Sequence, residues 1–453
     1  MLVLRLVAAF LLISSICNGS GNRNYAFSNK GIAPADTAFQ TVSVYLWPSW
    51  ARETSRDYDF WRASGYNTIS FLVTGISFVS PAVREANLLA YRQRIVDAQQ
   101  AGFKVGIVLL SNIGKTGHSF DPRDEQQLNQ RLDDIKLMLQ RLSIVNSITF
   151  FAGDPGGVPT KMGSDGVGYF WQMALNVRAL AERYAPHALF NVNTWAITHW
   201  DDIGISPFSV EFWEKETQYS KALLANPDFN GMGVEFPLHN YYRSLALHEY
   251  AKAGLDPVAF PAKQDVTDLF ARGIKQQWAW PYFLVDEVDD GYTGYLISKV
   301  HPTQSETRYI HNVVAISRQL GLNGMVVNAA VDSSGIQTEA LNVYAMGRMC
   351  ADSTLTPEQA IDEFAGFIAD ADSKRQFAEI LKFVENHSTW EASIPSAFRL
   401  PMFDTTHASA NSALLDLAHV KTNVQSPFPL PIEPGEYVRR LRKRLLDIAH
   451  TER

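Results

Sequence analysis

The chain has 453 residues, of which 40 are Lys or Arg and 47 are Asp or Glu, so its formal net charge is −7 at pH 7. Hydrophobic residues make up 46% and charged residues 19% of the chain, a balance that excludes a disordered protein and predicts a folded core. A mildly acidic chain is poorly suited to gripping a phosphate backbone, so nucleic acid is not an expected partner.

The first twenty residues have the pattern of a secretory signal. Arg5 precedes the apolar run Leu6 to Ile13, and small or polar residues follow it through Gly21. This run is too short to span a bilayer, and no later segment reaches about 18 uninterrupted apolar residues. We therefore expect residues 1–20 to be a signal peptide and the mature protein to be exported, periplasmic or secreted, without stable membrane insertion.

The sequence contains two cysteines, Cys17 and Cys350. Cys17 leaves lipidation open as an alternative, although Ile16 stands where a small residue usually precedes a lipidated cysteine. Once the signal is removed, Cys350 has no intrachain partner for a disulfide. We expect it to be a buried small hydrophobic residue rather than a nucleophile.

Eight short apolar runs, with helical stretches between them, follow an N-terminal extension over residues 21–40. The predicted strands are Thr41–Trp47, Thr68–Thr74, Lys104–Asn112, Ser147–Asp154, Ala188–Trp195, Gly231–Pro237, Tyr282–Asp286 and Gly324–Asp332. Helical periodicity is clearest in Asn87–Gln100, Asp124–Leu142 and Phe170–Tyr184, and Gly102 and Gly321 stand where helices should stop.

This alternation predicts an α/β fold, a (β/α)₈ TIM barrel over residues 41–352. The alternative is an open doubly wound sheet, as in a solute-binding protein, but the chain lacks the two similar halves of such a protein. Pro257–Phe260 could add a strand between the sixth and seventh. Residues 353–453 read as a helical C-terminal region with helices over Pro357–Asp370, Ser373–Asn386, Ser412–His419 and Gly435–His450.

Acidic residues stand at the ends of several predicted strands, where barrels of this type carry their active sites. The predicted catalytic residues are Asp154, Glu235, Asp286 and Glu287. Such carboxylates can serve as general acid, base or nucleophile. We expect Asp154 or Glu235 to be the acid and the Asp286/Glu287 pair to supply the nucleophile or base. Each also has a structural interpretation: Asp154 could cap a turn, and Glu235 could be a partnered core residue.

Tryptophans, amides and a histidine occur at the same strand ends. Aromatic rings can stack on sugar rings, while amides and histidine can bind hydroxyl groups. The predicted substrate-binding residues are Trp47, Asn112, Asn193, Trp195, His239, Asn240 and Asp332. Asp332 could equally be the N-cap of the last barrel helix.

Several other signatures are absent from the sequence. It contains no GxxxxGK[ST] phosphate loop, HExxH, paired CxxC or GxSxG motif. The acidic run from Asp286 is not a calcium loop, because Val288 and Ile297 occupy ligand positions. We therefore expect no cofactor and no dedicated metal site.

One stretch resembles a known family. Ala340–Asp352 (ALNVYAMGRMCAD), Leu355–Ala360 (LTPEQA) and the following Glu363-Phe364 resemble bacterial α-glucuronidases, in which the last barrel helix ends similarly and a helical region follows. Gly153–Gly156 (GDPG) is similar, more loosely, to glycosidase-related barrels and β-N-acetylhexosaminidases. In those an acid after strand four takes part in catalysis, which implies this role for Asp154.

Together these features predict an exported glycoside hydrolase that uses paired carboxylates at the C-terminal face of its barrel on a poly- or oligosaccharide. Carbohydrate is the expected partner. A non-catalytic glycan-binding barrel and a hydrolase of a non-sugar substrate are the alternatives, because a barrel does not dictate function. No residue pattern specifies the sugar, the linkage or an oligomeric state.

Overall fold

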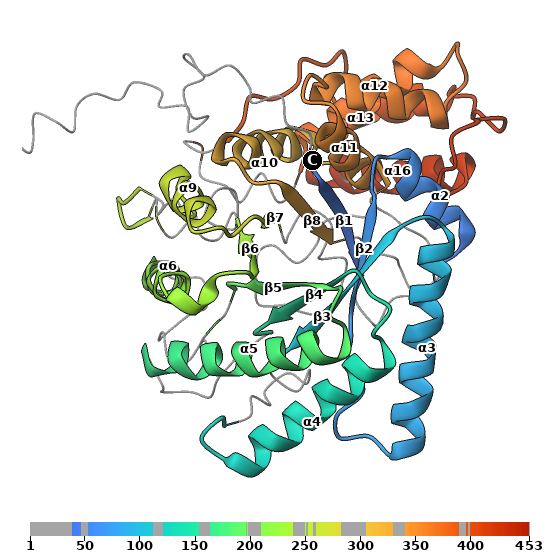
Figure 1. Cartoon of the computed structure of the whole chain (residues 1–453). Coiled ribbons are helices and arrows are strands. Elements are labelled where there is room, and N and C mark those ends of the chain that lie inside the picture. The colour runs from blue at the N-terminus through green and yellow to red at the C-terminus, as the bar shows by residue number, and fades with distance from the viewer. Residues whose placement is uncertain are drawn as a thin grey trace, which may run out of the picture.

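A computed structural model describes residues 39–46, 53–111, 121–153, 164–195, 197, 210–238, 250, 252–256, 260–281, 305–328, 340–388, 396 and 399–452. Within them, parallel strands follow one another around a closed barrel, and β8 returns to pair with β1 (Figure 1). The strands are β1 (Thr41–Leu46), β2 (Thr68–Leu72), β3 (Lys104–Leu110), β4 (Ser147–Phe151), β5 (Leu189–Asn193), β6 (Gly233–Pro237), β7 (Gln277–Trp280) and β8 (Gly324–Asn328). The predicted (β/α)₈ barrel is confirmed.

Helices alternate with these strands and cover the barrel. They are α2 (Ser55–Ala63), α3 (Pro81–Gln100), α4 (Glu125–Arg141), α5 (Ser164–Tyr184), α6 (Val210–Leu224), the short η2 (Pro227–Phe229), α9 (Lys263–Ala271), α10 (Thr307–Leu320) and α11 (Ala340–Ala351). Asp124 caps α4 by accepting from the backbone N–H groups of Gln126 and Gln127. Gly102 and Gly321 adopt positive φ angles of 88° and 86° where the preceding helices end, as predicted. In the described part of the chain, no helix is both long and apolar enough to cross a membrane.

The seventh strand lies at Gln277–Trp280, so its predicted position at Tyr282–Asp286 is wrong. The observed strand pairs with both β6 and β8. Trp278 and Trp280 are two residues apart, so both side chains face the inside of the barrel. Trp278 packs so closely on Gly324 that a Cβ atom at Gly324 would lie 2.2 Å from Trp278 Cδ1. The prediction followed aliphatic residues further along the chain and overlooked the alternating tryptophans, which are good strand formers. Residues 257–259 and 282–304 lie outside the described part.

The C-terminal region is helical as predicted and packs on the last barrel helices. Its helices α12 (Pro357–Ile368), α13 (Lys374–Asn386), α15 (Ala410–Leu417) and α16 (Pro434–Thr451) gather beside α10 and α11 (Figure 1). Cys350, on α11, is 1% exposed, and burial raises the pKa of its thiol to about 12. The predicted burial of Cys350 is confirmed.

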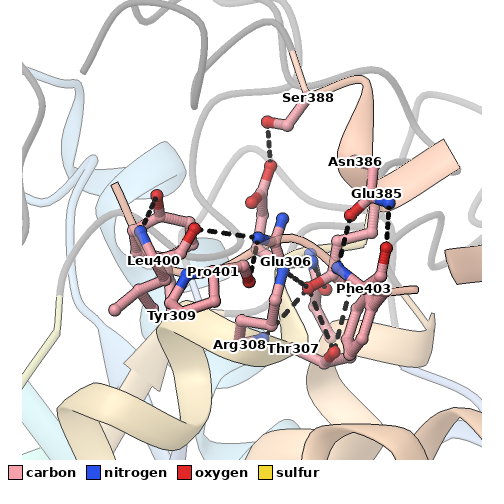
Figure 2. A network of polar contacts seen from close by, with 11 residues as sticks. Glu306, Thr307, Arg308, Tyr309, Glu385, Asn386, Ser388, Leu400, Pro401 and Phe403 are labelled. Carbon is pink, nitrogen blue, oxygen red and sulfur yellow. Dashed lines mark hydrogen bonds and ion pairs between the residues drawn. The ribbon is translucent and has the colours of Figure 1, made fainter. Parts of the chain in front are cut away.

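A buried polar network joins this region to the barrel (Figure 2). The carboxylate of Glu385, in the last turn of α13, accepts hydrogen bonds from Thr307 Oγ1 at 2.9 Å, the Arg308 backbone N–H at 3.0 Å and Arg308 Nε at 3.2 Å. The Arg308 guanidinium also donates to the Pro401 carbonyl at 2.8 Å. A negative charge at the first turn of α10 is favourable, because it faces N–H groups that have no acceptor within the helix and the positive end of the helix dipole.

Candidate active site

The interior of the barrel is unusually polar at its amino-terminal end. Ser43 and Ser70 share a hydrogen bond of 2.9 Å between their hydroxyl groups. Gly106 leaves room for this cluster, since a Cβ there would lie 2.5 Å from Ser147 Oγ and 3.0 Å from Ser70 Oγ. Barrels are more usually filled by branched aliphatic side chains. The inward positions of this one therefore bring polar groups into a space from which water is largely excluded.

Glu235 is the middle residue of β6, and its side chain faces this interior. The residue is only 4% exposed. Thr149, on β4, donates its hydroxyl to Oε1 at 2.5 Å, and the amide of Asn193, on β5, donates to Oε2 at 3.2 Å. Three neighbouring strands thus contribute one side chain each to a single carboxyl site.

The surroundings of Glu235 favour its protonated form. Burial raises the pKa of its carboxyl from 4.5 to about 7, although the hydrogen bonds from Thr149 and Asn193 act in the opposite direction. Near neutral pH the group therefore exists in both protonation states. A carboxyl with this pKa is suited to general acid–base catalysis.

An aromatic layer lies on the mouth side of Glu235. Phe151 is the next inward residue after Thr149 on β4, and Trp280 is the next inward residue after Trp278, the register partner of Glu235. The rings of Phe151 and Trp280 are 5.2 Å apart, and Tyr45 adds its ring at 6.1 Å from Trp280. All three rings are buried, so the carboxyl lies in an interior that is largely desolvated.

Asn193, one of the predicted binding residues, contacts this carboxyl, and the backbone of Trp195, another of them, contacts Asn193. Asn193 Oδ1 accepts from the backbone N–H of Trp195 at 2.9 Å, which leaves its amide N–H₂ turned toward Glu235. The Trp195 ring is 3% exposed and packs against Phe212 and Trp213 on α6. Direct contact of either residue with a substrate stays a prediction.

The other predicted site residues lie outside the described part of the chain. They are Trp47, Asn112, Asp154, His239, Asn240, Asp286, Glu287 and Asp332. The chain leading to Asp154 is fixed, because Ser111 Oγ donates to the Ala152 carbonyl at 3.1 Å and Gly153 adopts a φ of 78° that favours glycine. Among the described residues, no three His, Cys, Asp or Glu side chains cluster as metal ligands would.

Thr149 was missed as a functional candidate, although the sequence carries a signal for it. In Ser147–Phe151 it is polar, shares the inward face with Ser147 and is flanked by Ile148 and Phe150. A polar residue on the inward face of an otherwise apolar strand needs a hydrogen-bonding partner. That partner, Glu235, is distant in sequence, so only the strand order reveals it.

Comparisons with known proteins identify the fold. No protein-family model matches the sequence, and no curated protein matches it. Among solved structures, a family GH138 enzyme that targets pectin rhamnogalacturonan II is similar with a TM-score of 0.51 at 10% identity, over 92% of this chain and 57% of that one. A family GH115 4-O-methyl-α-glucuronidase with specificity for decorated arabinogalactans is similar with a TM-score of 0.54 at 11% identity, over 90% and 55% of the two chains.

The chain thus spans little more than half the length of these two enzymes. At such low identity the likeness concerns the fold. The predicted resemblance to glycoside hydrolase barrels, with an α-glucuronidase among them, is confirmed at that level.

Proposed function

We propose that the chain is an exported glycoside hydrolase that cleaves a glycosidic bond in a poly- or oligosaccharide at the carboxyl ends of the barrel strands. The observation that carries this proposal is the Glu235 carboxyl, buried between Thr149 and Asn193 with a pKa of about 7. The glycoside hydrolases among its structural neighbours support the same reaction class.

Glu235 would serve as the general acid. A protonated carboxyl gives its proton to the leaving glycosidic oxygen as the bond breaks, and it becomes a carboxylate in that step. The Thr149 hydroxyl can accept from the acid and donate to the carboxylate, because a hydroxyl has both capacities. The Asn193 amide is a donor that stabilises the carboxylate. The site therefore accommodates the group before and after proton transfer.

A second carboxylate would come from Asp154, Asp286 or Glu287. Asp154 follows Gly153 directly and leaves the same strand that carries Thr149. Its distance from the Glu235 carboxyl would set the outcome: about 5–5.5 Å gives retention through a glycosyl-enzyme, and about 6.5–9.5 Å leaves space for a water and gives inversion. Measuring the anomer released decides between these two.

The first experiment is a glycan panel incubated with the purified protein, with products identified by mass spectrometry. Because the two structural neighbours act on pectin and on decorated arabinogalactans, the panel includes rhamnogalacturonan, arabinogalactan and glucuronoxylan, together with N-acetylated oligosaccharides. Release of a defined sugar by the wild type supports the proposal. Glu235→Gln should then lower kcat by about a hundredfold to ten-thousandfold, as loss of a catalytic acid does. Glu182→Gln is the matched control, because Glu182 is exposed on α5, where it pairs with Arg178.

A glycan-binding barrel without catalysis is the second candidate. Two observations favour it: Glu235 is 4% exposed, and both of its carboxyl oxygens accept hydrogen bonds from side chains inside the barrel. Both are expected of an acid with a structural role. Binding of a panel glycan without release of any product, unchanged in Glu235→Gln, would select this candidate.

Export is the part of the proposal that rests on Arg5 and the apolar run Leu6–Ile13 alone. Expression of the full chain in a bacterial host, followed by fractionation and intact-mass analysis, tests it. We expect periplasmic protein shortened by about 20 residues. Full-length protein in the cytoplasm would contradict export and leave the proposed reaction unaffected.

A further inference from the structure

Phe78 is held in solvent at the rim of the barrel, on the loop that leads from the carboxyl end of β2 to α3. Its side chain is 76% exposed. Its φ is 59°, and it is the one non-glycine residue with positive φ in the described part of the chain. A bulky side chain is disfavoured in this conformation, and exposure forgoes the gain from burying a ring. Both features oppose folding, so they call for another explanation.

The start of the loop is fixed by side chains of α3. The Thr74 backbone N–H donates to Tyr91 Oη at 3.1 Å, and the Asn87 amide donates to the Gly75 carbonyl at 2.7 Å. Arg84 Nε donates to the Ile76 carbonyl at 2.9 Å. The Ile76 side chain is 1% exposed and so anchors the loop in the core.

The residue directly before Phe78 is fixed by α4. Ser77 Oγ donates to Asp134 at 2.6 Å and accepts from the Arg131 guanidinium at 3.0 Å. Arg131 also donates to the carbonyl of Leu110, the last residue of β3, and Arg84 pairs with Asp134 at 3.7 Å. The loop is thus clamped to α3, α4 and the end of a barrel strand. Phe78 stands outside this clamp with its ring presented to solvent.

We propose that Phe78 is an aromatic platform on which a sugar ring of the substrate stacks, beyond the point of cleavage. The inference rests on the proposed glycosidase function and adds a binding position at the β2 side of the rim. The flat ring complements the C–H face of a pyranose. Because the loop is fixed in advance, binding a sugar there orders little protein, and the contact energy is retained as affinity. A substrate long enough to reach the rim would gain from it, and a short one would not.

The test compares long and short substrates. Wild type, Phe78→Ala and Phe78→Trp are assayed on two-sugar and six-sugar fragments of rhamnogalacturonan, arabinogalactan and glucuronoxylan. In Phe78→Ala, the kcat/KM ratio of the six-sugar to the two-sugar fragment should fall about tenfold through KM, the size expected for losing one buried ring face. Phe78→Trp should keep the wild-type ratio.

Phe270→Ala is the matched control. Phe270 is also an exposed phenylalanine, at 38%, but it lies near the end of α9, which leads to the start of β7 and hence to the opposite end of the barrel. It should keep the wild-type ratio. Phe78→Gly guards against a folding artefact, since glycine accepts the left-handed conformation and the variant should fold yet show the same loss.

The outcomes separate the two proposals. If the wild type cleaves the fragments and Phe78→Ala has the same kcat/KM ratio of long to short fragment as Phe270→Ala, the sugar-stacking role of Phe78 is overturned. The proposed glycosidase function then stands. If Phe78→Ala loses the ratio but the folded Phe78→Gly does not, the loss is structural and the platform is again overturned. If the wild type neither cleaves nor binds any glycan of the whole panel, N-acetylated oligosaccharides included, both proposals fall.

Discussion

Thr149 on β4 donates its hydroxyl to the carboxyl of Glu235 on β6 across a distance of 2.5 Å, spanning the intervening strand β5. The contact exists because parallel strands of a closed barrel turn alternate side chains toward a common axis, where strands that are not hydrogen-bonded to each other meet. It places a hydroxyl, an amide and a carboxyl in a low-dielectric interior. In such surroundings hydrogen bonds are strong and unpaired polar groups are costly.

The first prediction concerns stability and pH. Glu235 has a pKa of about 7 in the folded chain and the ordinary value of 4.5 when unfolded. Between these values the folded state binds more protons than the unfolded state, so the free energy of unfolding falls as pH rises through this window. The contribution is about 3 kcal/mol, lost between roughly pH 4.5 and 7.

Glu235→Gln removes this titration. Urea unfolding at pH 4.5 and at pH 8 should show the variant gaining about 3 kcal/mol relative to wild type at the higher pH. Glu182→Gln changes an exposed site, so its unfolding free energy should stay close to that of wild type at both pH values. Equal pH dependence in wild type and Glu235→Gln would mean that the buried carboxyl titrates normally, and the assignment of Glu235 as the acid would lose its physical basis.

The second prediction concerns Thr149→Val, which replaces a hydroxyl by a methyl group of similar size. The hydrogen bond that it removes favours the carboxylate, so the pKa of Glu235 should rise further. If Glu235 is the acid, the alkaline limb of the pH profile of kcat/KM moves to higher pH. We also expect a loss of about 1–3 kcal/mol in unfolding free energy, because a buried partner is left with one bond fewer.

Thr68→Val is its control. Thr68 is also buried, at the start of β2, but its hydroxyl bonds to Asn67 instead of to a catalytic candidate. It should cost stability without moving the pH profile. An alkaline limb that stays in place in Thr149→Val would show that Glu235 does not govern the profile.

The fold could be predicted from the sequence because its signals are local and periodic. Asp124 and Gly321 mark helix boundaries by properties of the residues themselves, so α4 begins and α10 ends as expected. The predicted position of the seventh strand was wrong because composition misleads there. Trp278 and Trp280 belong to the observed strand, whereas the aliphatic residues after Tyr282 are more typical of a strand. Strand position depends on pairing with neighbours, which a single segment does not encode.

The site could be predicted only in part, for a related reason. Glu235 stands out because an acid within an apolar strand must have partners, and its partners are indeed there. Which residues these are depends on the strand order, so Thr149 was not found. Asn193 was selected as a sugar ligand, but its observed partner is the carboxyl of Glu235.

The third prediction tests how tightly the barrel interior is packed. A Cβ at Gly324 would lie 2.2 Å from Trp278 Cδ1, a contact that cannot form without movement of the indole. Gly324→Ala should therefore cost about 1–3 kcal/mol of unfolding free energy, the usual penalty of overpacking. Gly435→Ala provides the comparison, since Gly435 lies in the first turn of α16 with nothing within 4 Å of its added methyl group. That change should be stabilising by about 0.5–1 kcal/mol. Similar effects of the two variants in thermal unfolding would contradict the packing.

The last prediction concerns the network that fastens the C-terminal region. Glu385 is fully buried, and it binds both Thr307 and the buried guanidinium of Arg308. Glu385→Ala removes the carboxylate of this buried ion pair, so we expect a loss of about 3–5 kcal/mol in unfolding free energy. By contrast, Glu433→Ala removes the exposed partner of Arg56 and should cost less than about 1 kcal/mol. Because the network joins α13 to the start of α10, hydrogen exchange in Glu385→Ala should rise first in these two helices, while the strands on the far side of the barrel keep their protection. A uniform rise in hydrogen exchange across the whole chain would contradict this prediction. It would mean that the C-terminal helices and the barrel unfold as one cooperative unit.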